Sequence, residues 1–236
     1  MMNMKTMMVC GMMLLPSLTW AQNCCQNQKN KQATPTCCQG TSEKSCCENG
    51  GKKACCEMNN AVIQTIMSRQ SIRKYLDKPV EHEKLALIAK CGIHAPNALN
   101  RQLWAVRVVE NQDFIKGTTE IFKKEKTEMV KRDPNFKNMY RNAPNIIVVA
   151  TPKGQGQVDA GLLGENMMLA AKSLGLGTCC LGSAASFLNG SEACKPYLAK
   201  LNLPQGYEIC YVLAVGYPDE TPAMKTRDES KIEFVK

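Results

Sequence analysis

The sequence predicts an α+β fold in which helices flank a mainly antiparallel sheet. Apolar residues recur at helical spacing in several segments, and short β-branched runs typical of buried strands stand between them. These helices and strands do not alternate in regular βαβ units, which disfavours a parallel sheet. Of the 236 residues, 44% are hydrophobic, which is enough for a packed core.

The first half of the expected globular region mixes helices with a strand. Residues 61–69 and 81–95 have the apolar spacing of helices. Residues 103–110, LWAVRVVE, are rich in β-branched residues and predict a strand. Residues 111–132 are very polar and predict one long helix over the active site. We expect it to form part of a substrate lid at residues 111–143.

The second half contains the clearest helix, at residues 159–177. Leu163, Met167, Ala170 and Leu174 fall at helical spacing there, and Gly175 is suited to end the helix. The other predicted elements are a buried strand at 144–151, a strand that runs into a loop at 178–183, a helix at 190–201 and a buried strand at 207–218. Cys179 and Cys180 are expected to be small buried side chains.

The formal net charge is +9, but the basic residues are spread along the chain. Since they do not gather into one block, we expect no nucleic-acid partner. The excess is consistent with an anionic ligand or with solvated basic faces.

The N-terminal residues 1–21 have the features of a signal peptide. Lys5 gives a basic start, a short apolar run follows, and Thr19 and Ala21 occupy the small-residue positions before a cut at Gln22. We therefore expect an exported protein, in the periplasm or cell envelope. No later segment is apolar and long enough to be an integral membrane span.

Residues 22–60 form a cysteine-rich segment of low complexity, with almost no aliphatic or aromatic content. Such a composition buries too little apolar surface to form a core. Three pairs recur every nine residues, at Cys37, Cys38, Cys46, Cys47, Cys55 and Cys56. This pattern fits a disulfide-linked linker, a site for soft metal ions such as Cu(I) or Zn, or a thiol relay to the following domain.

Motifs for hydrolysis, phosphate-binding glycine loops and ordinary metal spacings do not occur. Instead, three polar clusters follow apolar elements, at residues 68–75, 95–104 and 224–230. Cations and hydroxyls suit a phosphate, and side-chain amides suit the edge of a flat heterocycle.

From Val62 onward the chain resembles the FMN-dependent nitroreductases. The family's Arg-x-Ser-x-Arg/Lys motif is matched by Arg69, Gln70, Ser71, Ile72 and Arg73. Its Pro-Ser-x-x-Asn-x-Gln-Pro-Trp signature is matched by PNALNRQLW at residues 96–104, and the Asp-x-Gly-x-x-x-x-Asn helix and the GLGTC sequence lie between Asp159 and Cys179. A basic tail pair stands at Lys225 and Arg227.

The resemblance implies a nitroreductase-like sandwich at residues 61–236 and a domain-swapped type of homodimer with FMN at the subunit interface. Arg69, Gln70, Ser71, Arg73, Lys225 and Arg227 would hold the phosphate, ribityl chain or pyrimidine edge. Pro96, Asn97, Ala98 and Asn100 would come from the other subunit. Leu181, Gly182 and Ser183 would present backbone near the reactive edge of the flavin.

The resemblance also implies an oxidoreductase that takes hydride from NAD(P)H and reduces small-molecule acceptors such as nitroaromatics or quinones by a ping-pong mechanism. The chemistry would be carried by the flavin, without a catalytic side chain. Asn97 and Leu103 depart from the usual Ser and Pro, which affects the expected acceptor preference. The alternative is an exported copper- or zinc-binding protein that uses its CC repeats beside a non-catalytic flavin-type domain.

Overall fold

The computed structural model describes residues 60–236. The expected signal peptide, nearly all of the cysteine-rich segment and the six cysteines of the alternative metal site lie outside the described residues. Among residues 60–236, no helix has both the length and the apolar character needed to cross a membrane.

A four-stranded sheet forms the centre of the described region. Its strands are β1 (Ala105–Val109), β2 (Asn145–Pro152), β3 (Gly177–Leu181) and β4 (Tyr207–Gly216). They are arranged in the order β1-β2-β4-β3, and all three neighbouring pairs are antiparallel. The expected α+β class with an antiparallel sheet is therefore confirmed.

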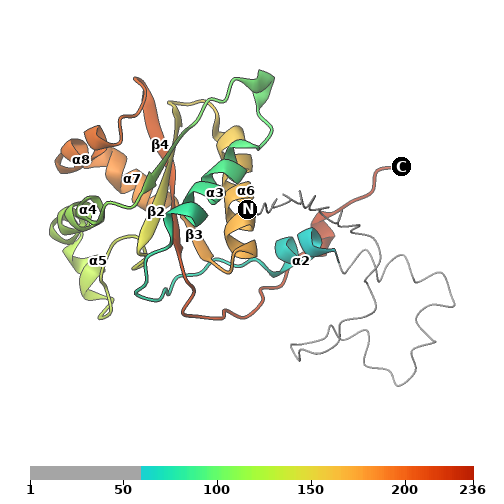
Figure 1. Ribbon diagram of the computed structural model, residues 1–236, viewed down its shortest axis with the longest axis horizontal. Coiled ribbons are helices and arrows are strands. Elements are labelled where there is room, and N and C mark those ends of the chain that lie inside the picture. The colour runs from blue at the N-terminus through green and yellow to red at the C-terminus, as the bar shows by residue number, and fades with distance from the viewer. Residues whose placement is uncertain (1–59) are drawn as a thin grey trace, which may run out of the picture. The chain divides into compact units, whose positions relative to one another are not determined.

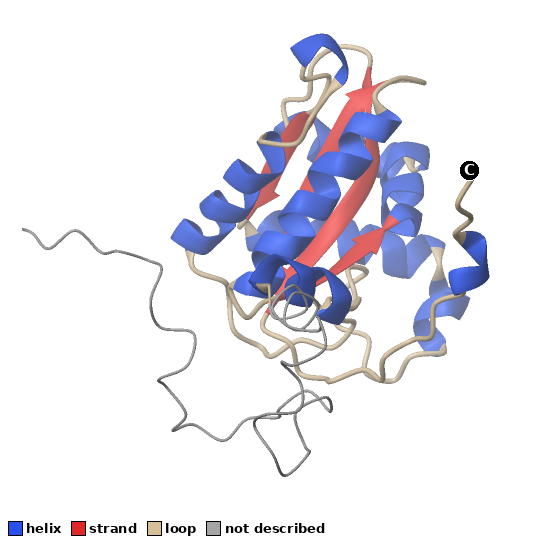
Figure 2. Ribbon diagram, turned by 90° about the vertical axis from the view of Figure 1, so that its right-hand side faces the viewer, coloured by secondary structure: helices blue, strands red, loops and turns tan. Residues whose placement is uncertain are grey.

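The helices cover both faces of this sheet. They are α2 (Ala61–Ser68), α3 (His82–Ile93), α4 (Gln112–Glu125), α5 (Thr127–Lys131), α6 (Gln157–Ser173), α7 (Gly182–Gly190) and α8 (Lys195–Lys200), with short 3₁₀ turns η2 (Ala98–Asn100), η3 (Glu192–Cys194) and η4 (Glu229–Lys231). Figure 1 shows α3 and α6 on one side of the sheet and α4, α7 and α8 on the other. Figure 2 shows helices of one layer lying in front of the strands.

The alternation of side chains along the strands divides the core in two. In β2, Ile147 and Val149 face Leu163 and Met167 of the α3 and α6 layer. The neighbouring side chains Ile146 and Val148 point to the opposite face and join the core below α4 and α7. Both faces of β2 are completely buried, which explains why its sequence is an uninterrupted apolar run rather than an alternating one.

Two expectations about helices were wrong. The single helix expected at residues 111–132 is two helices, because the backbone leaves helical geometry at Lys126 (φ −123°, ψ 39°). The loop expected after β3 is instead helix α7, which follows the strand directly. Its sequence of small residues, GSAASFLNG, has too few apolar positions to show a helical face.

The helix expected at residues 190–201 is shorter than predicted, since it consists of the turn η3 followed by α8. Cys179 is buried as expected, whereas Cys180 is exposed. Adjacent residues of a strand point to opposite faces, so only one of the two cysteines enters the core below α7.

The outer edge of β3 is covered by an extended segment, residues 69–76, which we call the strap. The backbone N–H of Ile72 donates to the carbonyl of Thr178 (2.9 Å), and Ser71 forms a parallel bridge with the same threonine. At the other end of the strap, Leu76 N–H donates to Tyr217 O (2.9 Å). The strap satisfies part of an otherwise open sheet edge, and it fixes Ser71 beside β3.

A pH dependence of stability is expected where α3 meets the end of β1. His82 Nδ1 lies 2.9 Å from a carboxylate oxygen of Glu110. This hydrogen bond and the negative charge raise the pKa of His82 above its ordinary value of 6.5. A raised pKa stabilises the folded state fully below pH 6.5, and the contribution is lost as the pH rises through the folded-state pKa.

We therefore expect His82→Gln to lower the free energy of unfolding more at pH 5.5 than at pH 8.5. Urea unfolding of both proteins at both pH values would measure this, with Glu110→Gln as a background in which the difference disappears. A loss of equal size at the two pH values would contradict the assignment.

Candidate functional site

The strap is joined to the C-terminal tail, residues 219–236. The Glu220 carboxylate accepts hydrogen bonds from the backbone N–H groups of Arg73 and Lys74. Gln70 Nε2 donates to Pro222 O (3.1 Å) and contacts Met224 Sδ at 2.9 Å. The contact between Gln70 and Met224 therefore brings together two of the three polar clusters expected from the sequence, residues 68–75 and residues 224–230.

The cations of the strap and tail are largely free of acidic partners. Arg69 makes one ion pair, with Glu165 at 3.4 Å. Among the described residues, the guanidinium of Arg73 donates only to Ser71 O (3.3 Å), and that of Arg227 only to the carbonyls of residues 225 and 226. Within residues 60–236, neither Arg73 nor the tail pair Lys225 and Arg227 forms an ion pair. Their charge is thus available to an anion.

A further cation, Arg141, was not found from the sequence; it lines a cavity together with Leu181, the last residue of β3. Burial raises the pKa of the Cys179 thiol, and the nearby positive charges of Arg73 and Arg141 oppose that rise. No motif marks Arg141, since its place depends on contacts between segments far apart in the sequence.

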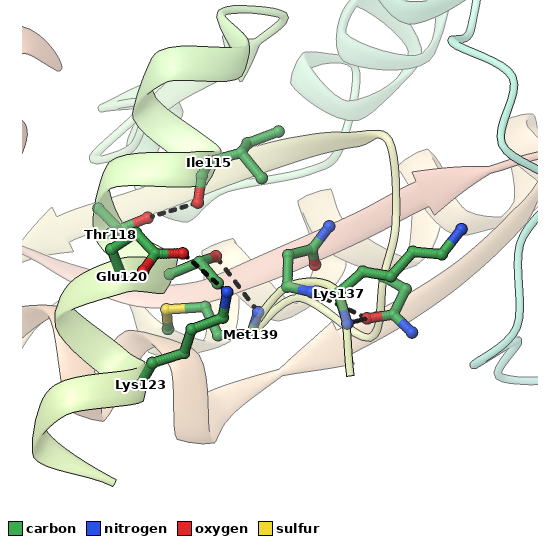
Figure 3. A network of polar contacts seen from close by, with 9 residues as sticks. Ile115, Thr118, Glu120, Lys123, Lys137 and Met139 are labelled. Atoms are coloured by element: carbon green, nitrogen blue, oxygen red, sulfur yellow. Dashed lines mark hydrogen bonds and ion pairs between the residues drawn. The ribbon is translucent and has the colours of Figure 1, made fainter. Parts of the chain in front are cut away.

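Arg141 belongs to a loop that asparagine side chains hold in place. Asn142 Oδ1 accepts from the backbone N–H groups of Lys137 (2.8 Å) and Asn138 (2.9 Å). The loop packs against α4, where Met139 N–H donates to Thr119 Oγ1 (3.4 Å) (Figure 3). Both Arg141 (φ 58°) and Asn142 (φ 62°) have left-handed backbone conformations. Asparagine tolerates this conformation better than most residues.

Two substitutions of Asn142 separate the contribution of its side-chain hydrogen bonds to stability from that of its left-handed backbone conformation. Asn142→Ala loses three side-chain hydrogen bonds and places alanine in the left-handed region, so we expect a cost of about 2–3 kcal/mol. Asn142→Gly loses the same bonds but adopts the conformation freely, so its cost should be about 1 kcal/mol smaller. Chemical denaturation measures both. Equal losses would show that the backbone conformation contributes little.

The third polar cluster forms a separate corner between α3 and β1. Asn97 Oδ1 accepts from the backbone N–H of Gln102 (2.8 Å), and Leu99, Asn100 and Gln102 have φ values of 54°, 52° and 51°. In the described part of the chain, no hydrogen bond or ion pair links residues 96–102 to the strap or tail. A single chain thus brings together only two of the three clusters, and the origin of the third from a second subunit stays a prediction.

Leu181, Gly182 and Ser183 lie where β3 ends and α7 begins. Leu181 is buried, whereas the two following residues are exposed. Leu181 and Ser183 line a cavity of about 610 Å³ between α7, α5 and the loop that carries Arg141.

Within residues 60–236, no three His, Cys, Asp or Glu side chains are grouped so that they could hold a metal ion. The described site is therefore a collection of cations, amides and backbone donors beside a partly apolar cavity.

A family model described as the nitroreductase family matches residues 66–217, which is more than half of the chain. The chain belongs to the nitroreductase family. The match includes Arg69 to Arg73, the corner at residues 96–104 and the end of β3, but it stops before Lys225 and Arg227.

Two proteins that are similar in sequence are named as flavin enzymes. The NADPH-flavin oxidoreductase of Vibrio harveyi is 28% identical over 185 residues, covering 72% of this chain and 70% of that protein. The FMN reductase [NAD(P)H] of Bacillus subtilis is 28% identical over 187 residues, covering 71% and 70%.

Solved nitroreductase structures share the fold. The Bacteroides fragilis nitroreductase with bound FMN superposes with a TM-score of 0.66 at 26% identity, covering 75% of this chain and all of that chain. The FMN-bound nitroreductase of Desulfitobacterium hafniense gives a TM-score of 0.65 at 26% identity, covering 75% and 99%. The predicted nitroreductase-like sandwich is thereby confirmed.

Proposed function

We propose that this member of the nitroreductase family is an FMN-dependent oxidoreductase that takes hydride from NAD(P)H and reduces nitroaromatic, quinone or similar acceptors. The observation that carries the proposal is the positive charge of Arg73 on the strap and of Lys225 and Arg227 on the tail, none of which forms an ion pair among the described residues. Relatives named as flavin oxidoreductase and FMN reductase, and solved structures with bound FMN, support the choice of cofactor.

The donor set fits the phosphate end of FMN. Arg69 and Arg73 lie on the strap, and the tail carries Lys225 and Arg227 just beyond the contact between Gln70 and Met224. Charged nitrogen donors without a carboxylate partner are suited to phosphate oxygens. The Ser71 hydroxyl donates to no acceptor among the described residues, so it is available to a polar ligand. Glu220 competes little, because it accepts from two backbone N–H groups of the strap.

Bound FMN would supply hydride acceptance and delivery, so the residues of this chain bind and orient rather than act as acid or base. Arg73 would place a positive charge where negative charge develops on reduction. Gly182 and Ser183 begin helix α7, where backbone N–H groups lack helical partners and are available to a carbonyl oxygen. Successive binding of donor and acceptor at one place gives a ping-pong order.

A homodimer is part of the proposal. Large apolar side chains are exposed on α2, on α6 and on the tail, including Met67 (70%), Val158 (77%) and Phe234 (84%). Exposed apolar surface of this extent is typical of a protein interface. A second subunit would also supply the corner with Asn97 and Asn100, which the single chain does not bring to the strap.

Residues 1–21 would direct export to the periplasm or cell envelope, and residues 22–60 would form the cysteine-rich segment of the mature protein. In that compartment the CC pairs are candidates for supplying electrons to the flavin domain, because thiols that bind metal or exchange electrons lie on the same chain. This part of the proposal rests on the sequence alone.

The test is the visible absorption spectrum of the purified mature chain before and after anaerobic addition of NADH or NADPH. A flavin spectrum that bleaches, and returns when a quinone is added, is the expected result. A flavin spectrum that stays unchanged would refute the nicotinamide donor. No flavin, even after FMN is supplied, would refute the central proposal and favour the metal-binding alternative.

A further inference from the structure

The cavity beside α7 has a shape that the flavin-binding residues alone do not explain. It extends from Leu181 and Ser183 at the beginning of the helix to Gly190 and Ser191 at its end. A nine-residue helix is about 13 Å long, so the cavity is longer than the corner where backbone donors meet a flavin. Its volume of about 610 Å³ is typical of a small-molecule site.

Flat aromatic rings form one wall of this cavity. Phe122 of α4 and Phe136 of the loop after α5 are stacked, with centroids 5.9 Å apart and planes at 11°. Phe187 of α7 meets Phe122 edge to face at 4.9 Å. Met129 and Met139 complete the apolar lining. Rings and thioethers of this kind favour a planar aromatic ligand.

The charged groups of the lining are unevenly distributed. Glu125, Lys126 and Asp133 lie along α4, α5 and the turn that follows, and Glu125 Oε1 accepts from Ser191 Oγ (2.6 Å). Acid and base therefore offset one another in that part of the lining. Arg141 belongs to the loop between α5 and β2 and lines the cavity as well. Among residues 60–236 it forms no ion pair or hydrogen bond through its side chain.

Arg141 is also held in place at a conformational cost. Its backbone is left-handed, and the hydrogen bonds of Asn142 fix the loop around it. The guanidinium carried by this loop offers two parallel donors that match a carboxylate or a sulfonate.

We propose that this cavity is the acceptor subsite, that it selects planar aromatic acceptors carrying a carboxylate or sulfonate group, and that Arg141 binds that group. The proposal rests on the proposed function, because the residues expected to face the flavin, Leu181 and Ser183, line the same cavity. Apolar walls would hold the ring, and the guanidinium of Arg141 would orient it.

Two matched probes, 4-nitrobenzoate and uncharged 4-nitrobenzamide, test this by isothermal titration calorimetry on the oxidised holoenzyme. We expect wild-type protein to bind the carboxylate about tenfold more tightly than the amide, and Arg141→Gln to lose this preference. Arg141→Lys should retain part of it. Arg132→Gln removes a nearby exposed cation that does not line the cavity and should behave as wild type.

Equal affinity of the wild-type protein for both probes, or a preference that survives in Arg141→Gln, would overturn the proposal. Steady-state kinetics provide a second readout, since Arg141→Gln should raise KM about tenfold for 4-nitrobenzoate alone, with little change in kcat. Failure of the proposed function is distinguishable, because it would appear as a protein without flavin absorbance, whereas failure here leaves the flavin in place and removes only the charge preference.

Discussion

Arg73→Gln is expected to weaken FMN binding about tenfold to a hundredfold. The guanidinium of Arg73 contacts only the Ser71 carbonyl and forms no ion pair among the described residues, so its charge is available to the cofactor. A hydrogen bond to a charged group contributes more than a neutral one, and glutamine keeps the polarity while losing the charge. Titration of the apoprotein with FMN, followed by fluorescence quenching, measures the effect.

The same variant should make the midpoint potential of bound FMN more negative by about 30 mV. A positive charge stabilises the reduced form more than the oxidised form, and about 1.4 kcal/mol corresponds to that shift for two electrons. Lys74→Gln is the matched control, because adjacent residues of an extended strap point to opposite sides. An unchanged potential with weakened binding would assign Arg73 to the phosphate. If neither the FMN affinity nor the midpoint potential changes, Arg73 does not contact the cofactor.

Gly177→Ala is expected to cost about 2 kcal/mol of stability and to reduce FMN binding as well. A Cβ atom at this position would lie 2.7 Å from both Cβ and Cγ1 of Ile72. Ile72 is buried and its N–H bonds to Thr178 O, so the strap has little freedom to move aside. The added methyl group would push the strap, with Ser71 and Arg73, away from the edge of β3.

Gly161→Ala is the control for this substitution. A Cβ on Gly161, in helix α6, meets no atom within 4 Å, and alanine favours a helix by about 1 kcal/mol over glycine. Thermal unfolding and FMN titration of both variants separate the two cases. If Gly177→Ala unfolds at the wild-type temperature and binds FMN normally, the contact between strap and strand does not position the cofactor site.

Much of the fold could be predicted from local sequence patterns. The strands β2 and β4 appear as apolar runs because both of their faces are buried, and α6 shows Leu163 and Met167 at helical spacing because they fill the core beneath it. Helix α7 was missed because its small residues carry no such pattern. The break at Lys126 was missed because the polar sequence continues unchanged through it.

By itself, the sequence determined the class of fold, the order of most elements and the motif residues from Arg69 to Arg73. These features depend on burial and composition within a few neighbouring residues, so short sequence patterns are enough to predict them. Only the tertiary structure decided that the strap covers β3, that Glu220 and Gln70 join it to the tail, and that Arg141 lies at the cavity. Each of these arrangements depends on segments distant in sequence that lie side by side, and their polar contacts leave no periodic pattern in the chain.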